Sequence, residues 1–333
     1  MATLAEIRAK IQAQDSKSGG NSSYDNAIYP HWNIDTDTTA SLRFLPDGDA
    51  ENDFFWLERL IIKLPFKGVK GGEENRPTLV QVPCVEMWGM DCPVLTEVRP
   101  WYKMNDENME KLASKYWKKR SYLFQGFVRE SSLKEDEIPE NLIRRFVMSP
   151  QLFKMIKGIL MDPDLKELPT DYEKGIDFRV SKTMKTGDKG TQYAGYETSS
   201  WARSETPLSP EELAAIETHG LFDLKNYLPK KPEAVELQVI AAMFQASVDG
   251  DLYDPEKFAQ YYKPAGMNFD STSNNSTSDN VTVPTAEVTP TTVKEETKEP
   301  EAAPAVEPST GNGELSAAEQ ILARIRNREE TTD

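Results

Sequence analysis

The sequence predicts a mixed α+β fold that is mainly β: an open barrel with helical insertions, flanked by an N-terminal arm and a disordered C-terminal tail. Short strand-like runs recur from Thr38 to Ala265, separated by turn signals. Helix signals interrupt these runs without the regular alternation of strand and helix that a doubly wound sheet requires. Beyond residue 265 the large apolar side chains almost disappear. Of the 333 residues 38% are hydrophobic, so we expect a real core, and we expect it in the body.

An amphipathic arm is predicted over residues 1–22. Apolar side chains recur there at helical spacing with basic side chains beside them: Leu4, Ile7 and Ile11, with Arg8 and Lys10. The polar, glycine-bearing stretch DSKSGGNSS that follows is typical of a hinge. We therefore expect the arm to move independently of the body.

Residues 23–265 form the predicted core domain. β-Branched and aromatic residues gather there in short runs, which predict strands at 41–46, 54–66, 78–84, 121–128, 142–148, 176–180 and 192–201. Ser149 and Pro150 supply an N-cap and first-turn pair for one helix, and Ser209 with Glu212 forms a capping-box signature for another. A third helix is expected from Pro232.

The C-terminal region is predicted to be a tether that ends in a helix. Residues 266–313 are rich in Ser, Thr, Asn, Pro and Glu, a composition that buries too little surface to offset chain entropy. Apolar side chains recur at helical spacing again within 314–333, which predicts a terminal helix. Residues 271–333 carry twelve acidic and five basic side chains, about −7 of the formal net charge of −16. The acidic total therefore does not exclude a basic surface on the body.

Composition also indicates a compartment. The first residues lack a continuous apolar run, and no later stretch approaches the roughly 20 apolar residues that a membrane helix needs. Two cysteines, Cys84 and Cys92, are too few for a secreted disulfide framework, although their spacing leaves a single bond open. We therefore expect a cytosolic protein without a membrane partner.

The densest functional signal lies between Trp101 and Arg129, where seven of 29 residues are aromatic. This segment is also basic, and the mixture suits single-stranded nucleic acid, since cations hold phosphates while rings stack on bases at roughly 1–3 kcal/mol per stack. The alternative is that the rings fill a core and the basic residues solvate the opposite face. The candidate contacts are Tyr102, Lys115, Tyr116, Trp117, Lys118, Lys119, Arg120, Tyr122 and Phe124.

A weaker basic and aromatic patch occupies a glycine-bearing hairpin between Arg179 and Arg203. Alone it favours a solvated turn, but two such segments in one domain could line opposite walls of one groove. Its candidate contacts are Lys182, Lys185, Lys189, Tyr193 and Tyr196, to which the 142–148 run adds Arg144 and Phe146.

Enzyme signatures are nearly absent. Of the two histidines, His219 ends a predicted helix, where histidine commonly serves the helix C-terminus. The chain has no phosphate loop, no nucleophile elbow and no H-E-x-x-H motif. Acidic clusters at 73–76 and 134–140 are typical of solvated loops, so a metal-dependent nuclease is the least favoured alternative. We expect a protein that is not an enzyme.

Three stretches resemble the single-stranded DNA-binding (helix-destabilising) proteins of T-even-like bacteriophages: SLRFLP at 41–46, CPV at 92–94 and KKRSYLF, after a short helix, at 118–124. The resemblance covers roughly residues 2–265. It implies an oligonucleotide-binding (OB) fold with inserted subdomains and cooperative coverage of unpaired DNA without strong sequence preference. It also implies a role in phage DNA replication, recombination and repair in the cytoplasm of an infected bacterial host.

Carried over by position, the resemblance places Arg43, Phe146, 118–122 and 193–196 in a DNA cleft. It assigns contact between neighbouring molecules to the arm, here Leu4, Ile7, Arg8 and Lys10. The C-terminal tail is expected to contact phage replication and recombination proteins.

The family's zinc centre, one histidine and three cysteines, is incomplete here. Cys84 and Cys92 match two of the ligands, Leu95 stands where a closing cysteine is expected, and no histidine occurs near 62–64. A closed structural zinc site needs four ligands. We therefore expect neither zinc nor another cofactor, with the two cysteines as remnants of the site.

The sequence favours binding of single-stranded DNA without catalysis. The competing interpretation is a protein-interaction or virion-assembly factor, in which the aromatic segments are core and the two terminal helices bind other proteins.

Overall fold

The computed structural model describes residues 26–264, except 73, 105, 136–138 and 188–189, together with Met267. The predicted arm, the C-terminal helix and all of the predicted linker but Met267 lie outside these residues.

The described residues form one open sheet of eight strands, in which every strand pairing is antiparallel. The order is β3-β2-β4-β1-β6-β7, with β5 beside β4 and β8 beside β6. The strands are β1 (Thr38–Leu45), β2 (Leu57–Phe66), β3 (Thr78–Pro83), β4 (Lys119–Glu130), β5 (Arg144–Met148), β6 (Phe178–Thr186), β7 (Gln192–Gly195) and β8 (Ser200–Trp201). The prediction of a mixed fold built mainly on an open arrangement of β-strands is confirmed at this level.

One predicted strand, 192–201, is divided into β7 and β8. The amide of Ser199 donates to the carbonyl of Tyr196 at 3.0 Å, which turns the chain between the two strands. The Ser199 hydroxyl then accepts from the amide of Ser181, on β6, at 3.0 Å. Strand pairing with β6 is therefore interrupted between β7 and β8.

Helices cover parts of the sheet. They are α2 (Pro93–Trp101), α3 (Glu107–Tyr116), α4 (Pro150–Leu160), α5 (Pro210–His219), α6 (Ala234–Asp249) and α7 (Pro255–Phe258), with short 3-10 helices η1 (His31–Asn33), η2 (Val85–Trp88) and η3 (Leu224–Tyr227). Two of them begin where capping predicted: Ser149 accepts from Leu152, and Ser209 completes a capping box with Glu212. The helix expected from Pro232 begins at Ala234.

The pattern analysis missed helix α2, although the sequence carried its signal. Pro93 occupies the first turn, and Val94, Val98 and Trp101 recur at helical spacing and are buried. Helix α3, which the resemblance anticipates as a short helix before 118, begins at an Asp106 cap.

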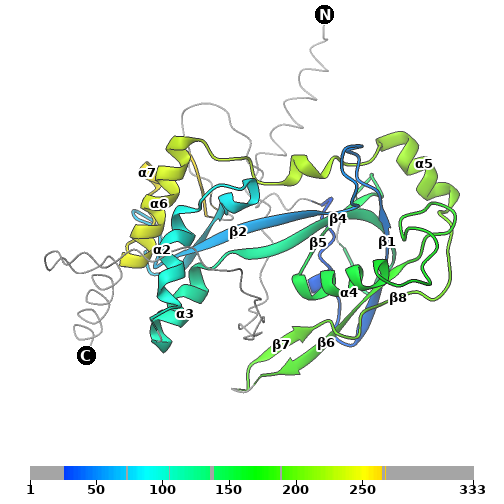
Figure 1. Cartoon of the computed structure of the whole chain (residues 1–333), viewed down its shortest axis with the longest axis horizontal. Helices are drawn as coiled ribbons and strands as arrows, with labels where there is room; N and C mark the ends of the chain where they lie inside the picture. Colours follow the sequence, from blue (N-terminus) through cyan, green and yellow to red (C-terminus); the bar gives the residue numbers. More distant parts are fainter. Residues whose placement is uncertain are drawn as a thin grey trace, which may run out of the picture.

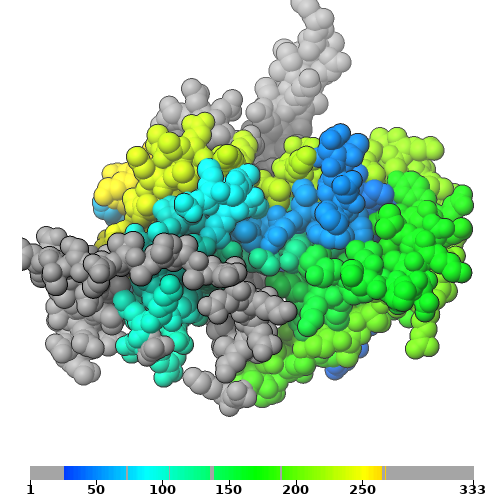
Figure 2. All heavy atoms as spheres, in the orientation of Figure 1, coloured from blue at the N-terminus to red at the C-terminus, as the bar shows by residue number. Residues whose placement is uncertain are grey.

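The two largest of four buried clusters in the described residues lie along the sheet. The first packs Leu60, Ile62 and Leu64 of β2 beneath α2, α3 and α6, and the second fills the curve of β1, β4, β5 and β6, with α4 packed against it. In Figure 1, β2 and β4 run from a group of helices at one end to α4 and β6–β8 at the other. Figure 2 shows the same division, with cyan and yellow residues at one end and green residues at the other. No described helix combines the length and apolar character that a bilayer crossing requires.

Candidate nucleic-acid interface

The boundary between the two core clusters is marked by an ion pair on the helix-bearing face of the sheet. Strand pairing sets Leu60 opposite Arg120 and Glu58 opposite Tyr122, so these side chains share one face. Leu60 belongs to the first cluster and Tyr122 to the second. Between them, Arg120 Nε lies 2.5 Å from Glu58 Oε1, with the side chains 48% and 42% exposed.

A series of aromatic rings continues from this ion pair. Tyr122 stacks on Phe153 of α4, with centroids 3.6 Å apart and planes at 12°. Phe153 meets Trp56 edge to face at 5.4 Å, and Trp56 meets Phe54 at 4.8 Å. Exposure rises along the series, because Tyr122 is 7% exposed, Phe153 and Trp56 are half-buried, and Phe54 is 58% exposed. We call the set Phe54, Trp56, Glu58, Arg120, Tyr122 and Phe153 the junction surface.

The hydroxyl of Tyr122 ties the aromatic and charged ends of the junction surface together. Burial raises the pKa of Tyr122, and the negative charge of Glu58 raises it further. Arg120 opposes both effects, since its charge and its hydrogen bond to the hydroxyl favour the ionised form. The surface therefore offers rings at one end and a guanidinium at the other, which is the combination that unpaired nucleotides require.

The other predicted cations of this segment lie around the start of β4. Lys118 Nζ is 2.7 Å from Glu86 of η2, and Arg99 bonds to the same carboxylate. Lys119 Nζ donates to the carbonyl of Ser114 at 3.1 Å, and Lys115 is exposed on the last turn of α3. Most of these cations therefore already have a partner.

A second aromatic pair lies beside these cations. Tyr102 meets Trp117 edge to face at 5.2 Å, and the Tyr102 hydroxyl is 3.2 Å from that of Ser114. Tyr102 is 36% exposed and Trp117 is half-buried, so both predicted residues remain accessible at the edge of the first cluster.

Tyr122 is itself a core residue with one face covered by Phe153, so it supports the surface and does not stack on a base. Three further predicted stacking residues also belong to the cores. Tyr116 is 2% exposed, packs edge to face on Phe244 and shares a hydrogen bond with Ser247 at 3.0 Å. Phe124 and Phe146 are fully buried in the second cluster. A ring closed in by other side chains cannot stack on a base, so the structure corrects the prediction for these positions. Tyr116 lies on the buried face of α3, and Phe124 and Phe146 lie on the buried faces of β4 and β5.

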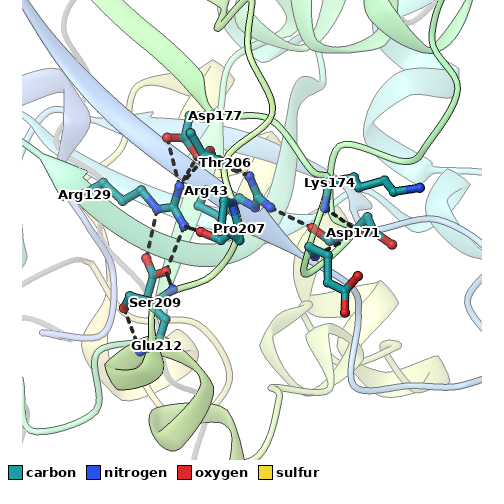
Figure 3. A network of polar contacts seen from close by, with 10 residues as sticks. Arg43, Arg129, Asp171, Lys174, Asp177, Thr206, Pro207, Ser209 and Glu212 are labelled. Atoms are coloured by element: carbon teal, nitrogen blue, oxygen red, sulfur yellow. Dashed lines mark hydrogen bonds and ion pairs between the residues drawn. The ribbon is translucent and has the colours of Figure 1, made fainter.

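Arg43 is likewise a structural residue, which corrects its placement in the cleft. It is fully buried and donates to the Asp171 carbonyl at 2.6 Å and to Asp177 at 3.4 Å. Figure 3 shows it beside Arg129, which holds Asp177 at 2.9 Å and Glu212 at 2.8 Å. This network fastens the start of α5 and the loop before β6 to the sheet.

Arg144 also has an internal role. It is 5% exposed, and both of its terminal nitrogens reach Glu135, at 2.7 and 2.8 Å. One of them additionally donates to the carbonyl of Ile28 at 3.3 Å. A bidentate pair of this kind is fixed in place, so the structure corrects the prediction of a DNA contact.

The hairpin of β6 and β7 contributes less than predicted. Lys182 Nζ donates to the carbonyls of Trp32 and Ile34, at 2.8 and 2.9 Å, and thus braces η1. Tyr196 is 9% exposed and also contacts η1 through His31, so it is corrected to a packing role. Lys185 pairs with Glu197 at 2.6 Å beside a half-buried Tyr193, and these two remain accessible.

Some predicted residues lie outside the described part of the chain. These are Lys189 in the hairpin and the self-association residues Leu4, Ile7, Arg8 and Lys10.

Sequence reasoning missed the aromatic residues Phe54, Trp56 and Phe153. The first two stand in the FFW run, which was assigned to a strand, whereas β2 begins only at Leu57. Phe153 lies in the helix that Ser149 and Pro150 were predicted to begin, to which no binding role was assigned. The sequence signal that could have found Phe54 and Trp56 was the density of aromatic residues before β2. No local pattern indicates that this segment packs against Phe153 of α4.

Cys84 and Cys92 cap η2 and α2 and are buried against each other. The hydrogen bond between the thiols, with burial, raises the pKa of Cys84, whereas that bond and the backbone amides of α2 lower the pKa of Cys92 to about 6. Among the described residues no third histidine, cysteine or carboxylate completes a metal-binding group. Two thiols do not fit the four-ligand zinc centre of the resembled family.

Comparison with known proteins gives no assignment, because no family model and no curated protein matches the chain.

Proposed function

We propose that this protein binds single-stranded DNA through the junction surface. The observation that carries the proposal is the partly exposed series Phe54, Trp56 and Phe153, anchored on Tyr122 and ending at the Arg120 guanidinium. Rings with free faces stack on bases of any sequence, and an adjacent cation holds the phosphates.

The existing ion pairs are compatible with this function. Arg120 and Glu58 are both nearly half-exposed, and such surface pairs contribute only about 0–1 kcal/mol. A phosphate can therefore replace Glu58 at little cost. Binding by exchange of this kind weakens steeply as salt is added.

The curvature of the second core supports an OB-like assignment within the mixed fold. Five strands in the order β5, β4, β1, β6, β8 surround this core, and α4 contacts both β4 and β8. A five-stranded, partly open barrel is the architecture of OB domains, whose outer strands bind oligonucleotides. On this proposal the junction surface lies where β4 leaves the barrel.

The wider biological role is proposed from the resemblance. The protein would act without catalysis or zinc, in the cytoplasm of an infected bacterium, and cover unpaired DNA during phage replication, recombination and repair. Residues 1–22 would join neighbouring molecules, and residues 314–333 would contact replication proteins.

A fluorescence titration with oligo-dT tests the proposal. Stacking on Trp56 should quench emission, with an affinity well above that for duplex DNA of equal length and with a strong salt dependence. Equal affinity for duplex and single strands, or no quenching at low salt, would reject it in favour of a protein-interaction factor. Degradation of the oligonucleotide in magnesium would instead favour a nuclease.

A further inference from the structure

The opposite face of the same sheet carries a different cluster of charges. Side chains alternate along a strand, so Arg59 points away from the face that holds Glu58. Pairing places Ser121 opposite Arg59 and Lys119 opposite Ile61, and Lys63 follows on β2. The members of this face on β2, β3, β4 and β5 include Arg59, Lys63, Lys119 and Arg145, and no carboxylate stands among them. In a chain with a net charge of −16, this is an unusual concentration of positive charge.

Like Arg145, Arg59 is a buried member of the cluster. It is 7% exposed, and its Nε donates to the Ser121 hydroxyl at 3.1 Å. That is the single hydrogen bond of its side chain to the described residues, and none of their carboxylates pairs with it. Burial lowers the pKa of Arg59 to about 10, with no charged partner to oppose the effect. A buried guanidinium without a counter-charge is costly, and it points to a ligand that supplies one.

The terminal nitrogens of Arg59 reach the surface, beside a narrow and mainly apolar hollow of about 10 Å³ that is too small to enclose an anion. Leu123, Val147, Tyr227 and Arg145 also line this hollow. The Arg145 guanidinium already lies over the Tyr227 ring, 3.5 Å from its centroid, so it forms part of the wall. Burial lowers the pKa of Lys63, and the nearby positive charges of Lys119 and Arg59 lower it further. An anion bound between Arg59, Lys63 and Lys119 would offset the repulsion among these three charges.

We propose that Arg59, with Lys63 and Lys119, forms a binding site for a phosphate group on the face opposite the junction surface. A phosphate fits better than a carboxylate, because it carries nearly two negative charges at neutral pH and three acceptor oxygens for several donors. The Arg59 fork provides paired donors for two of those oxygens. The group belongs either to a nucleic acid, as a terminal or backbone phosphate, or to free phosphate. The site stands on these contacts and does not require the proposed function.

Thermal unfolding of the full chain tests the site with inorganic phosphate, compared with chloride at equal ionic strength. Phosphate should raise the Tm of the wild type, and calorimetry should show affinity reduced about 10- to 100-fold in Arg59→Met, which removes the charged hydrogen bonds. The matched control is Arg179→Met, an exposed arginine on β6, which should respond to phosphate like the wild type. In chloride alone, Arg59→Met should keep or raise the Tm, because it removes an uncompensated buried charge.

Two results would overturn the site. One is an equal phosphate response in wild type and Arg59→Met. The other is a sharp loss of Tm for Arg59→Met in chloride, which would mean that the fold itself satisfies the guanidinium. The conservative variant Arg59→Lys, which keeps the charge and loses the fork, should fold and retain a weakened response.

Titrations with oligo-dT that carries or lacks a 5′-phosphate identify the source of the phosphate group. A loss of affinity on Arg59→Met only for the phosphorylated strand identifies a terminal phosphate, and an equal loss for both identifies the backbone. A response to inorganic phosphate alone identifies a free anion. Failure of oligo-dT binding in the wild type would reject the proposed function and leave the phosphate site to be judged by Tm.

Discussion

Tyr122 and Phe153 lie parallel at 3.6 Å and join strand β4 to helix α4 across the edge of the second core. The stack holds Phe153 so that its edge meets Trp56 at 5.4 Å. If bases stack here, as we propose, they meet rings that are already fixed in place, and less side-chain entropy is lost on binding. The fold itself holds the aromatic series in position.

Trp56→Ala should weaken binding to oligo-dT about tenfold. The reason is the loss of one stacking platform, which contributes roughly 1–3 kcal/mol. Fluorescence anisotropy of a labelled oligo-dT measures the effect. Tyr261→Ala, a half-buried tyrosine beyond α7, is the control and should bind like the wild type. If both variants bound equally well, the junction surface would not be the binding site.

Charge changes at the ion pair should act in opposite directions. Arg120→Glu should lower affinity and reduce the salt slope by about one, because one phosphate contact is lost. Glu58→Gln should raise affinity, since Arg120 is then released from its carboxylate. Titrations at several salt concentrations separate these effects, with Lys166→Glu as a distant exposed control. An unchanged salt slope in Arg120→Glu would exclude a phosphate contact there.

Glu212→Gln should destabilise the fold by roughly 3 kcal/mol, because it removes a partner of the partly buried Arg129. Burial alone would raise the pKa of Glu212, but hydrogen bonds from Arg129 and the Ser209 amide lower it below its ordinary value. Its stabilising contribution is therefore complete above the unfolded-state pKa and is lost as pH falls through the folded-state value. Urea unfolding at pH 7 and in acid should show a smaller loss with acid in the variant than in the wild type.

The buried His31 should make the free energy of unfolding depend on pH in a range above the one in which Glu212 acts. Burial, helped by the charge of Lys182, lowers its pKa from 6.5 to about 4. The unfolded chain binds the proton first, so stability should fall as pH drops from about 6.5 to about 4, by roughly 3 kcal/mol. Thermal melts across this range should show the slope in the wild type and in His219→Gln, and its loss in His31→Phe. A slope that persists in His31→Phe would assign it to other groups.

Local rules accounted for most of the described secondary structure. The strand runs, the Ser149 and Ser209 caps and the β6–β7 hairpin depend on neighbours within a few residues. The resemblance to phage DNA-binding proteins also rests on local motifs, and what it implies about function stays a prediction. The missed helix α2 was readable from Pro93 and the spacing of Val94 and Val98.

The sequence by itself determined where aromatic and basic residues are dense, and only the tertiary structure decided which of them are accessible. Alternation makes Arg120 and Tyr122 share a face, but it does not say which face is covered. Coverage depends on packing between segments distant in the chain, such as α6 over Tyr116, α4 over Tyr122 and the loop before β6 around Arg43. The same long-range packing buries Arg59 among cations, which no short pattern records.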